Sequence, residues 1–377
     1  MAHIPRFGEQ APWFRARTAS NPRYSFDTVA GRVNVLCFYG SAGDDYSKRV
    51  LAGMQARRAL FDDVSACFFG VSVDPADEAS ERLHDQLPGI RHFRDFDGAV
   101  ARAYGLLEGN RFQRVTFVLD ARLRVHSVIP FTQAAEAHVQ AVLAAVDALL
   151  REMQSLSIPA PVLVIPRVFE PALCRRLIDY YNAGGAYDSG FMREVDGKTV
   201  GVYDYGHKRR SDKDIDDEQL RQTCMLRIHD RVAPEILRAF QFRATRIERH
   251  IVACYDAQSG GHFRAHRDNT TPGTAHRRFA VSVVLNTGEF EGGELRFAEF
   301  GQQTYAPPAG GAVVFSCSLL HEATPVTAGL RYTYLPFLYD DAAAQVRQQN
   351  AGTITVDERS RQLAGEQPGD AGVTMNT

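Results

Sequence analysis

The stretch ACYDAQSGGHFRAHRDN, residues 253–269, contains the one His-x-Asp triplet of this 377-residue sequence, His266-Arg267-Asp268. In an extended segment, residues i and i+2 point to the same face, so an imidazole and a carboxylate would lie side by side. The triplet follows an apolar run at 251–255 and the pair Gly260-Gly261, which indicates a position near the end of a strand. We predict that His266 and Asp268 bind the same metal ion.

Working outward from this stretch, a second histidine, His321, lies 55 residues beyond His266. It follows the apolar run AVVFSC (312–317), which is typical of a buried strand. Two histidines and one carboxylate form the facial triad of non-haem Fe(II) oxygenases, which leaves coordination positions open for a co-substrate and O2. The predicted metal ligands are therefore His266, Asp268 and His321.

Ten residues after His321, Arg331 begins the next predicted strand, and Thr333 shares its face. A guanidinium group can bind a carboxylate through two hydrogen bonds, and a neighbouring hydroxyl can add a third. An arginine among apolar strand neighbours such as Leu335 and Phe337 is otherwise uncommon. We predict that Arg331, assisted by Thr333, binds the distal carboxylate of a dicarboxylate co-substrate.

Three segments together resemble the prolyl-4-hydroxylase-type branch of the 2-oxoglutarate oxygenases. They are residues 253–269, VVLNTGEFEGGELRF (283–297) and GGAVVFSCSLLHEATPVTAGLRYTYLPFLY (310–339). The resemblance spans about residues 247–339 and implies a double-stranded β-helix (jelly-roll) core. It implies iron ligands at His266, Asp268 and His321, and a 2-oxoglutarate clamp at Arg331. Tyr255 matches a tyrosine that often lines the 2-oxoglutarate pocket, but the second tyrosine, which can precede the Leu-Asn pair of this family, is absent: the sequence there is VVLN (283–286).

The same resemblance implies the reaction and what it requires. Catalysis would need Fe(II), with 2-oxoglutarate and O2 as co-substrates and L-ascorbate as a candidate reductant. The product would be a hydroxylated aliphatic carbon of a peptidyl or free amino acid, with proline as the first choice.

The first half of the chain alternates strand and helix patterns. We predict strands at 33–39, 66–73, 115–119 and 125–131, and helices at 45–64, 76–86, 98–104 and 133–153. This order predicts an α/β domain with a largely buried sheet.

This half resembles the peroxiredoxin group of thioredoxin folds over about residues 5–150. The resemblance rests on VLCFYG (35–40), ARAYGL (101–106) and RVTFVLD (114–120). The family's proline, threonine and peroxidatic cysteine fall on Gly40, Asp44 and Ser47, and Arg114 matches its thiolate-stabilising arginine. A serine hydroxyl cannot act as a low-pKa thiolate, and Cys37 lies inside a strand. We predict a catalytically silent domain that serves docking, homodimer formation or substrate presentation.

The second half is divided from the first by SLSIPAP, and its pattern changes from helices to short strands. We predict helices at 171–183 and 217–240, then strands at 246–255, 279–286, 294–300, 312–317 and 331–339. The predicted organisation is a peroxiredoxin-like domain (1–154), a linker (155–161), an oxygenase domain (162–344) and a polar, disordered tail (345–377). Residues 187–217, between the two helical patterns, are predicted to be irregular; such a stretch is a lid, a binding loop or a disordered segment, and contact with the iron site and substrate is one of these alternatives.

Composition limits the other classes of function. The formal net charge of −2 gives no overall attraction to nucleic acid or anionic membranes. No apolar run reaches the roughly 20 residues of a membrane span, and the first residues are polar, so we expect a cytoplasmic protein. The six cysteines form no CxxC or zinc-like spacing and are expected to be reduced and mostly buried.

Two other interpretations were weighed against the oxygenase. A thiol peroxidase in the first half is disfavoured by Ser47. A non-catalytic sensor or adaptor is disfavoured because a retired site has no physical reason to keep four interdependent groups, His266, Asp268, His321 and Arg331.

Overall fold

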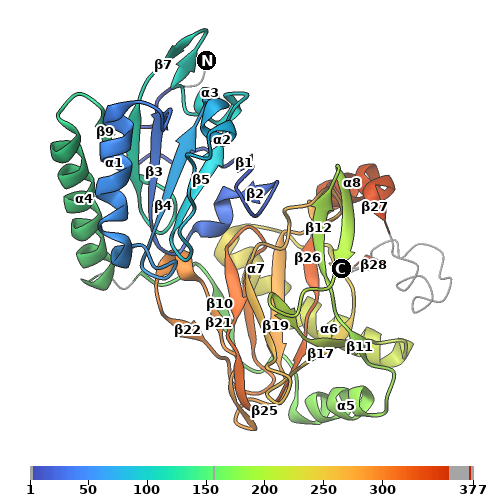
Figure 1. Cartoon of the computed structure of the whole chain (residues 1–377). Helices are drawn as coiled ribbons and strands as arrows, with labels where there is room; N and C mark the ends of the chain where they lie inside the picture. The colour runs from blue at the N-terminus through green and yellow to red at the C-terminus, as the bar shows by residue number, and fades with distance from the viewer. Residues whose placement is uncertain (1–2, 156–157, 356–372, 375–377) are drawn as a thin grey trace. The chain divides into compact units, whose positions relative to one another are not determined.

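The computed structural model describes residues 3–155, 158–355 and 373–374 (Figure 1). The chain divides into two compact units, one of Met1–Pro159 with Ala298–Gln302 and one of Ala160–Phe297 with Gln303–Thr377. The division between Pro159 and Ala160 falls inside residues 155–161, of which 156–157 lie outside the described residues. Each unit is described by itself.

The first unit contains a five-stranded sheet in the order β5-β4-β3-β8-β9. Its strands are β3 (Val33–Gly40), β4 (Ala66–Ser72), β5 (Ile90–Arg94), β8 (Val115–Leu119) and β9 (Val125–Pro130). The pairs β3–β4 and β4–β5 are parallel, and β3–β8 and β8–β9 are antiparallel. This sheet confirms the predicted thioredoxin-like fold.

Helices cover this sheet because its central strands are mostly apolar and fully buried. The helices are α1 (Asp45–Gln55), α2 (Ala76–Ala79), α3 (Ala99–Ala103) and α4 (Ala135–Ser155), with the short strand pairs β1 (Arg15–Ala16) with β2 (Tyr24–Ser25) and β6 (Leu107–Glu108) with β7 (Arg111–Phe112). Figure 1 shows α1 and α4 side by side on one face of the sheet, where Val50, Met54 and Val142 join its buried core. Every residue of β3 and β4 is buried, as expected for a sheet covered on both faces.

Two predicted helices of this unit are too long. The helix predicted at 45–64 ends at Gln55, because the chain must turn back so that Phe61 enters the core ahead of β4. The helix predicted at 76–86 is the single turn α2, because Glu81 adopts a left-handed conformation (φ 51°) and ends it.

The second unit is built on two sheets between which the chain passes repeatedly. Four strands of the larger sheet lie in the order β17-β25-β19-β23, and four of the smaller sheet lie in the order β18-β24-β21-β22. They are β17 (Ile251–Asp256), β18 (His262–His266), β19 (Phe279–Val284), β21 (Leu295–Arg296), β22 (Thr304–Tyr305), β23 (Ala312–Ser316), β24 (His321–Ala323) and β25 (Val326–Tyr334). This alternation confirms the predicted double-stranded β-helix fold.

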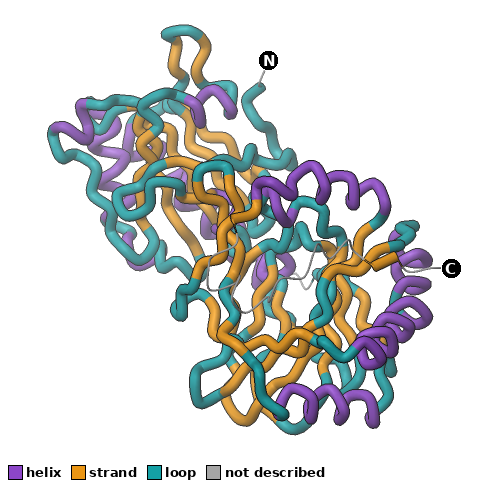
Figure 2. The backbone as a smooth tube through the Cα atoms, turned by 90° about the vertical axis from the view of Figure 1, so that its right-hand side faces the viewer, coloured by secondary structure: helices purple, strands orange, loops and turns teal. Residues whose placement is uncertain are grey.

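Further strands extend both sheets. The larger sheet adds β10 (Leu163–Ile165), β11 (Tyr187–Asp188), β15 (Ser211–Asp214), β16 (Arg246–Glu248), β20 (Phe290–Gly292), β26 (Phe337–Tyr339) and β28 (Val373–Thr374), and the smaller adds β14 (Lys208–Arg209). A separate small sheet contains β12 (Phe191–Val195), β13 (Lys198–Val202) and β27 (Ile354–Thr355). Figure 2 distinguishes the strands, in orange, from the helices, in purple.

Helices cover one face of the larger sheet, which leaves its other face for the predicted co-substrate residues. The helices of this unit are α5 (Pro171–Asn182), α6 (Glu218–Arg231), α7 (Ala233–Phe240) and α8 (Asp341–Asn350). Residues of α5, α6 and α7 share one buried cluster with Cys254, Tyr332 and Tyr334 of the sheet. Since side chains alternate along a strand, Tyr255 and Arg331 point to the opposite face.

Within the described residues, no helix is long and apolar enough to cross a membrane.

Several predicted elements of this unit are interrupted. The helix predicted at 217–240 is two helices, α6 and α7, because Pro234 begins a new first turn. The strand predicted at 246–255 breaks at Arg249, whose φ is 52°. The strand predicted at 294–300 is shorter, because the 3-10 turn Ala298–Phe300 follows β21. The strand predicted at 331–339 begins earlier, at Val326, and Pro336 divides it into β25 and β26.

The prediction that residues 187–217 are irregular is wrong, and the tail predicted to be disordered is ordered in its first residues. Residues 187–217 form five strands, β11 to β15, since their polar residues pair within the sheets rather than remain in a loop. The tail is ordered from 345 to 355, because Asp340 caps α8, Ala343 is fully buried, and β27 pairs with β13. Tail residues 356–372 and 375–377 lie outside the described residues.

Candidate metal and co-substrate site

The structure brings together the three predicted metal ligands. His266 ends β18, Asp268 lies two residues beyond it, and His321 begins β24, the strand paired with β18. The Nε2 atom of His266 lies 3.6 Å from Oδ1 of Asp268, and Nε2 of His321 lies 3.4 Å from Oδ2. The three candidate ligand atoms all lie within 4.8 Å of one another. This donor set fits a small ion such as Fe(II).

Both imidazoles are oriented by the backbone. Nδ1 of His266 lies 2.7 Å from the carbonyl oxygen of Arg264, and Nδ1 of His321 lies 3.0 Å from that of Leu319. A carbonyl can only accept, so each Nδ1 carries the proton and each Nε2 is left as a lone-pair donor. Hydrogen bonds of this kind fix the ring plane of a metal-binding histidine.

The electrostatics of the cluster favour metal-binding protonation states. Burial alone would raise the pKa of Asp268, but the neighbouring His321 and His266 outweigh it, and the pKa is held well below its usual range. Burial, followed by the effect of His266, lowers the pKa of His321 to about 4. At neutral pH the cluster therefore contains an ionised carboxylate and a neutral His321.

The two chain segments that carry these ligands are tied together. The backbone N–H of Asp268 donates to the carbonyl of Cys317 (3.0 Å), and Nδ2 of Asn269 donates to Oγ of Ser318 (2.8 Å). The guanidinium of Arg267 donates to the carbonyl of Ser318. These bonds hold the segment after β18 against the segment before β24, so the ligand spacing is set without the ion.

The predicted co-substrate residues lie together on the inner face of the larger sheet. Arg331 pairs directly with Tyr255 across β25 and β17, and its guanidinium carbon lies 5.0 Å from the centre of the Tyr255 ring. Arg331 is 3% exposed, and it has no ion-pair partner within the described residues. Burial lowers its pKa, Tyr255 opposes this, and Arg210 adds to it. Thr333 is fully buried, and its hydroxyl has no hydrogen-bond partner among the described residues.

These groups fit the distal carboxylate of 2-oxoglutarate. An unpaired buried guanidinium and an unpaired buried hydroxyl are both costly, and one carboxylate would satisfy both. Gly293 leaves the room that Arg331 needs, since a Cβ atom there would lie 2.6 Å from the Cδ atom of Arg331. Gly293 therefore has a steric role beside the clamp.

The structure adds a residue that the sequence did not single out. Arg210 is 7% exposed, and its Nη1 lies 3.5 Å from the hydroxyl oxygen of Tyr255. It also binds Asp212, with Nη2 2.6 Å from Oδ2. The sequence signal for this residue was the basic run Lys208-Arg209-Arg210. Three consecutive charged residues give no reason to place the third one inside the protein.

The first unit has no thiolate at the peroxiredoxin position. Ser47 is buried at the start of α1, where its hydroxyl lies 2.6 Å from Oδ2 of Asp44. Arg114 pairs with the same carboxylate at 3.1 Å. Burial raises the pKa values of Cys37 and Cys67 to about 12, so both are protonated at neutral pH. The polar groups at this position therefore satisfy one another.

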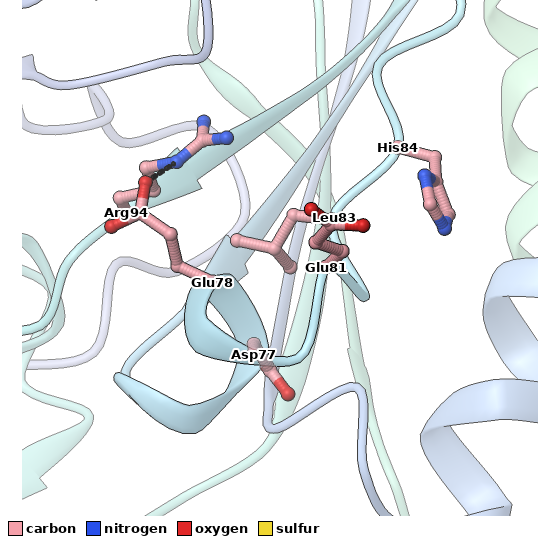
Figure 3. A pocket seen from close by; sticks show the side chains of 6 residues that line it. All are labelled: Asp77, Glu78, Glu81, Leu83, His84 and Arg94. Carbon is pink, nitrogen blue, oxygen red and sulfur yellow. Dashed lines mark hydrogen bonds and ion pairs between the residues drawn. The ribbon is translucent and has the colours of Figure 1, made fainter.

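A hollow of about 330 Å3 in this unit is also unlike a metal site (Figure 3). It is lined by Asp77, Glu78, Glu81, Leu83, His84 and Arg94. Glu78 is already paired with Arg17 and Arg94, and the buried carboxylate of Asp77 accepts hydrogen bonds from the Ala42 backbone and Ser72. Its best-placed acids are thus occupied within the fold.

Comparison with known proteins agrees with the family resemblance of each half of the chain. Residues 250–339 match the 2OG-Fe(II) oxygenase superfamily, and residues 7–128 match the AhpC/TSA family. The second unit thus contains a 2-oxoglutarate–Fe(II) oxygenase domain and the first a peroxiredoxin-type domain, which confirms both resemblances found in the sequence.

The curated relatives are hydroxylases. A PKHD-type hydroxylase of Delftia acidovorans is 34% identical over 121 residues, which cover 30% of this chain and 53% of that protein. Another from Thioalkalivibrio sulfidiphilus is 32% identical over 141 residues, with 35% and 63% covered. The chain thus spans about half to two-thirds of the length of these two relatives.

The similar solved structures fall into the same two groups. A prolyl-4-hydroxylase of Pseudomonas putida has 18% identity and a TM-score of 0.37, with 52% of this chain and 98% of that chain covered. The bacterioferritin comigratory protein of Xanthomonas campestris has 22% identity and a TM-score of 0.31, with 36% and 92% covered.

Proposed function

We propose that this protein is an Fe(II)- and 2-oxoglutarate-dependent dioxygenase that hydroxylates an aliphatic carbon of a peptidyl or free amino acid, with proline as the first choice. The observation that carries the proposal is the pairing of two incomplete sites in one domain. One is a cluster of His266, Asp268 and His321 with the geometry of a metal site. The other is a buried arginine, Arg331, without an anionic partner in the described residues.

In this proposal, His266, Asp268 and His321 hold Fe(II), and the iron supplies the oxidising power through its reaction with O2 and 2-oxoglutarate. The protein contributes ligand geometry, because the backbone carbonyls of Arg264 and Leu319 fix both imidazoles. Three protein ligands leave positions for the keto-acid end of 2-oxoglutarate and for O2.

The distal carboxylate of 2-oxoglutarate would be held by Arg331, Thr333 and Tyr255. Arg331 offers two parallel N–H donors, and the Thr333 hydroxyl offers a third hydrogen bond. Because this face is buried between the two sheets, the co-substrate would bind with little competition from water. L-ascorbate is proposed as the reductant that maintains the ferrous state.

The substrate would approach from the side of β12 and β13. Phe263 stacks on His266 with ring centres 3.5 Å apart, His207 lies 6.5 Å from His266, and Phe191 of β12 lies 4.5 Å from His207. The same hairpin exposes Met192 (49%). An aromatic wall and an exposed apolar hairpin support a peptide or an apolar amino acid as substrate.

For the first unit, we propose a supporting role without chemistry of its own. Its core is complete, but Ser47 and Asp44 occupy the peroxidatic position. A folded domain of this kind contributes surface, either to a homodimer or to the oxygenase substrate.

The test is an anaerobic titration of the protein with Fe(II) and 2-oxoglutarate, followed by an assay of succinate release across a panel of peptides and amino acids. We expect saturable 2-oxoglutarate binding that depends on metal, and succinate release that depends on substrate. Absence of metal-dependent 2-oxoglutarate binding would contradict the proposed function.

A further inference from the structure

Arg210 occupies a corner of the oxygenase domain at which the chain changes sheets. Lys208 and Arg209 form β14 in the smaller sheet, where Lys208 pairs with Phe263 of β18. Ser211 to Asp214 form β15 in the larger sheet, where Asp212 pairs with Ala253 of β17. Arg210 is the residue between them, and its side chain is buried (7% exposed). A charged residue at such a corner must be paired to be tolerated.

The guanidinium of Arg210 is anchored on one side by an anion and a hydroxyl. Its Nη2 lies 2.6 Å from Oδ2 of Asp212 and 3.2 Å from Oγ of Ser189. Ser189 in turn donates to Asp212 and accepts from the ammonium of Lys208 at 2.7 Å. Burial raises the pKa of Asp212, but Arg210 and Lys208 together bring it down to about 2, so the carboxylate stays ionised. The orientation of Arg210 is therefore set by this network and needs no ligand.

On its other side, Arg210 meets the hydroxyl of Tyr255. Nη1 lies 3.5 Å from that oxygen, and the guanidinium carbon lies 5.8 Å from the ring centre. The guanidinium carbon of Arg331 lies 5.0 Å from the centre of the same ring. A phenol oxygen can accept such bonds while its single hydrogen is donated elsewhere. With the Arg210 N–H group on the oxygen, the hydroxyl hydrogen is directed away from Arg210, toward the side on which a carboxylate bound to Arg331 would lie.

We propose that Arg210 is a positioning residue that acts through Tyr255, by turning the Tyr255 hydroxyl into a hydrogen-bond donor for the distal carboxylate of 2-oxoglutarate. This inference rests on the proposed function. The buried charges are consistent with an anionic ligand, since the guanidinium groups of Arg210 and Arg331 are accompanied by one carboxylate, Asp212, which is already paired with Arg210.

The test is a double-mutant cycle with Arg210→Met, Tyr255→Phe and the double variant. The dissociation constant of 2-oxoglutarate is measured calorimetrically on the full-length, Mn(II)-loaded protein without O2. We expect Arg210→Met to weaken 2-oxoglutarate binding by about tenfold in the wild-type background, and by less than about twofold when Tyr255 is already phenylalanine. Mn(II) affinity should be unchanged in all variants, and kcat at saturating 2-oxoglutarate should change less than KM.

A tenfold loss in both backgrounds would overturn the proposal, because Arg210 would then bind the carboxylate itself. No loss in either background would overturn it as well. If Arg210→Met fails to fold because Asp212 loses its partner, Arg210→Lys decides in its place. It keeps the charge for Asp212 but cannot span both partners, so it should show the same dependence on Tyr255. Wild-type protein that binds no 2-oxoglutarate would instead refute the proposed function.

Discussion

Replacing Arg331 by alanine tests the co-substrate site most directly. Arg331 is only 3% exposed, and it has no competing ion pair in the described structure. The affinity for a bound carboxylate would therefore depend on this side chain. Alanine removes two charge-assisted hydrogen bonds, each worth about 1.5–3 kcal/mol. Water that enters the vacated space recovers part of this, so we expect a net loss of about 3 kcal/mol. That corresponds to a roughly 150-fold higher dissociation constant for 2-oxoglutarate.

The assay is calorimetric titration of 2-oxoglutarate into the Mn(II)-loaded protein, with Mn(II) affinity measured in parallel. Arg331→Lys keeps the charge but not the two-pronged geometry, and should lose about tenfold. Arg243→Ala, an exposed arginine of the same unit, is the matched control and should behave as wild type. A change below about threefold in Arg331→Ala, with the fold intact, would refute the assignment of Arg331 as the clamp.

Three further predictions follow from other parts of the structure. His266→Ala should abolish Fe(II) binding and turnover, because it removes one of three clustered ligands; full activity of this variant would disprove the triad. In the first unit, burial lowers the pKa of His92 from 6.5 to about 4, so the folded state favours the neutral imidazole. The free energy of unfolding should therefore fall as the pH drops from 6.5 to about 4. Between about pH 7 and about pH 5 this amounts to about 2 kcal/mol of unfolding free energy. Denaturant unfolding, followed by the fluorescence of the single tryptophan, Trp13, should show this loss of unfolding free energy in the wild type but not in His92→Phe. An equal pH dependence of stability in both proteins would contradict the prediction. The intact chain should not reduce hydrogen peroxide with thiol donors at enzyme-like rates, and Ser47→Cys should be a poor peroxidase because Asp44 lies beside the new thiol and raises its pKa. Rapid thiol-dependent turnover in the unmodified chain would require Cys37 or Cys67 to be reconsidered.

The sequence alone predicted the chemistry-bearing residues where they follow local rules. His266 and Asp268 are two residues apart at a strand end, and Arg331 and Thr333 are two residues apart within a strand, so alternation was sufficient to place each pair on one face. The absence of a thiol at the peroxidatic position of the first unit could also be read from the sequence, because Ser47 at that position is a matter of residue identity. The meeting of His321 with the other two ligands was expected from the family resemblance, and the pairing of β18 with β24 brings it about.

Tertiary structure decided the features that depend on pairing between distant segments. Residues 187–217 appeared irregular because their strands are short and polar, and no periodicity within the segment shows that β14 joins one sheet and β15 the other. The burial of Arg210 follows from that change of sheets. Its partners, Ser189 and Tyr255, lie 21 and 45 residues away in sequence, and only the folded chain brings their side chains within hydrogen-bonding distance. Local sequence determines which face a side chain takes along a strand, whereas the pairing of strands determines what that face meets.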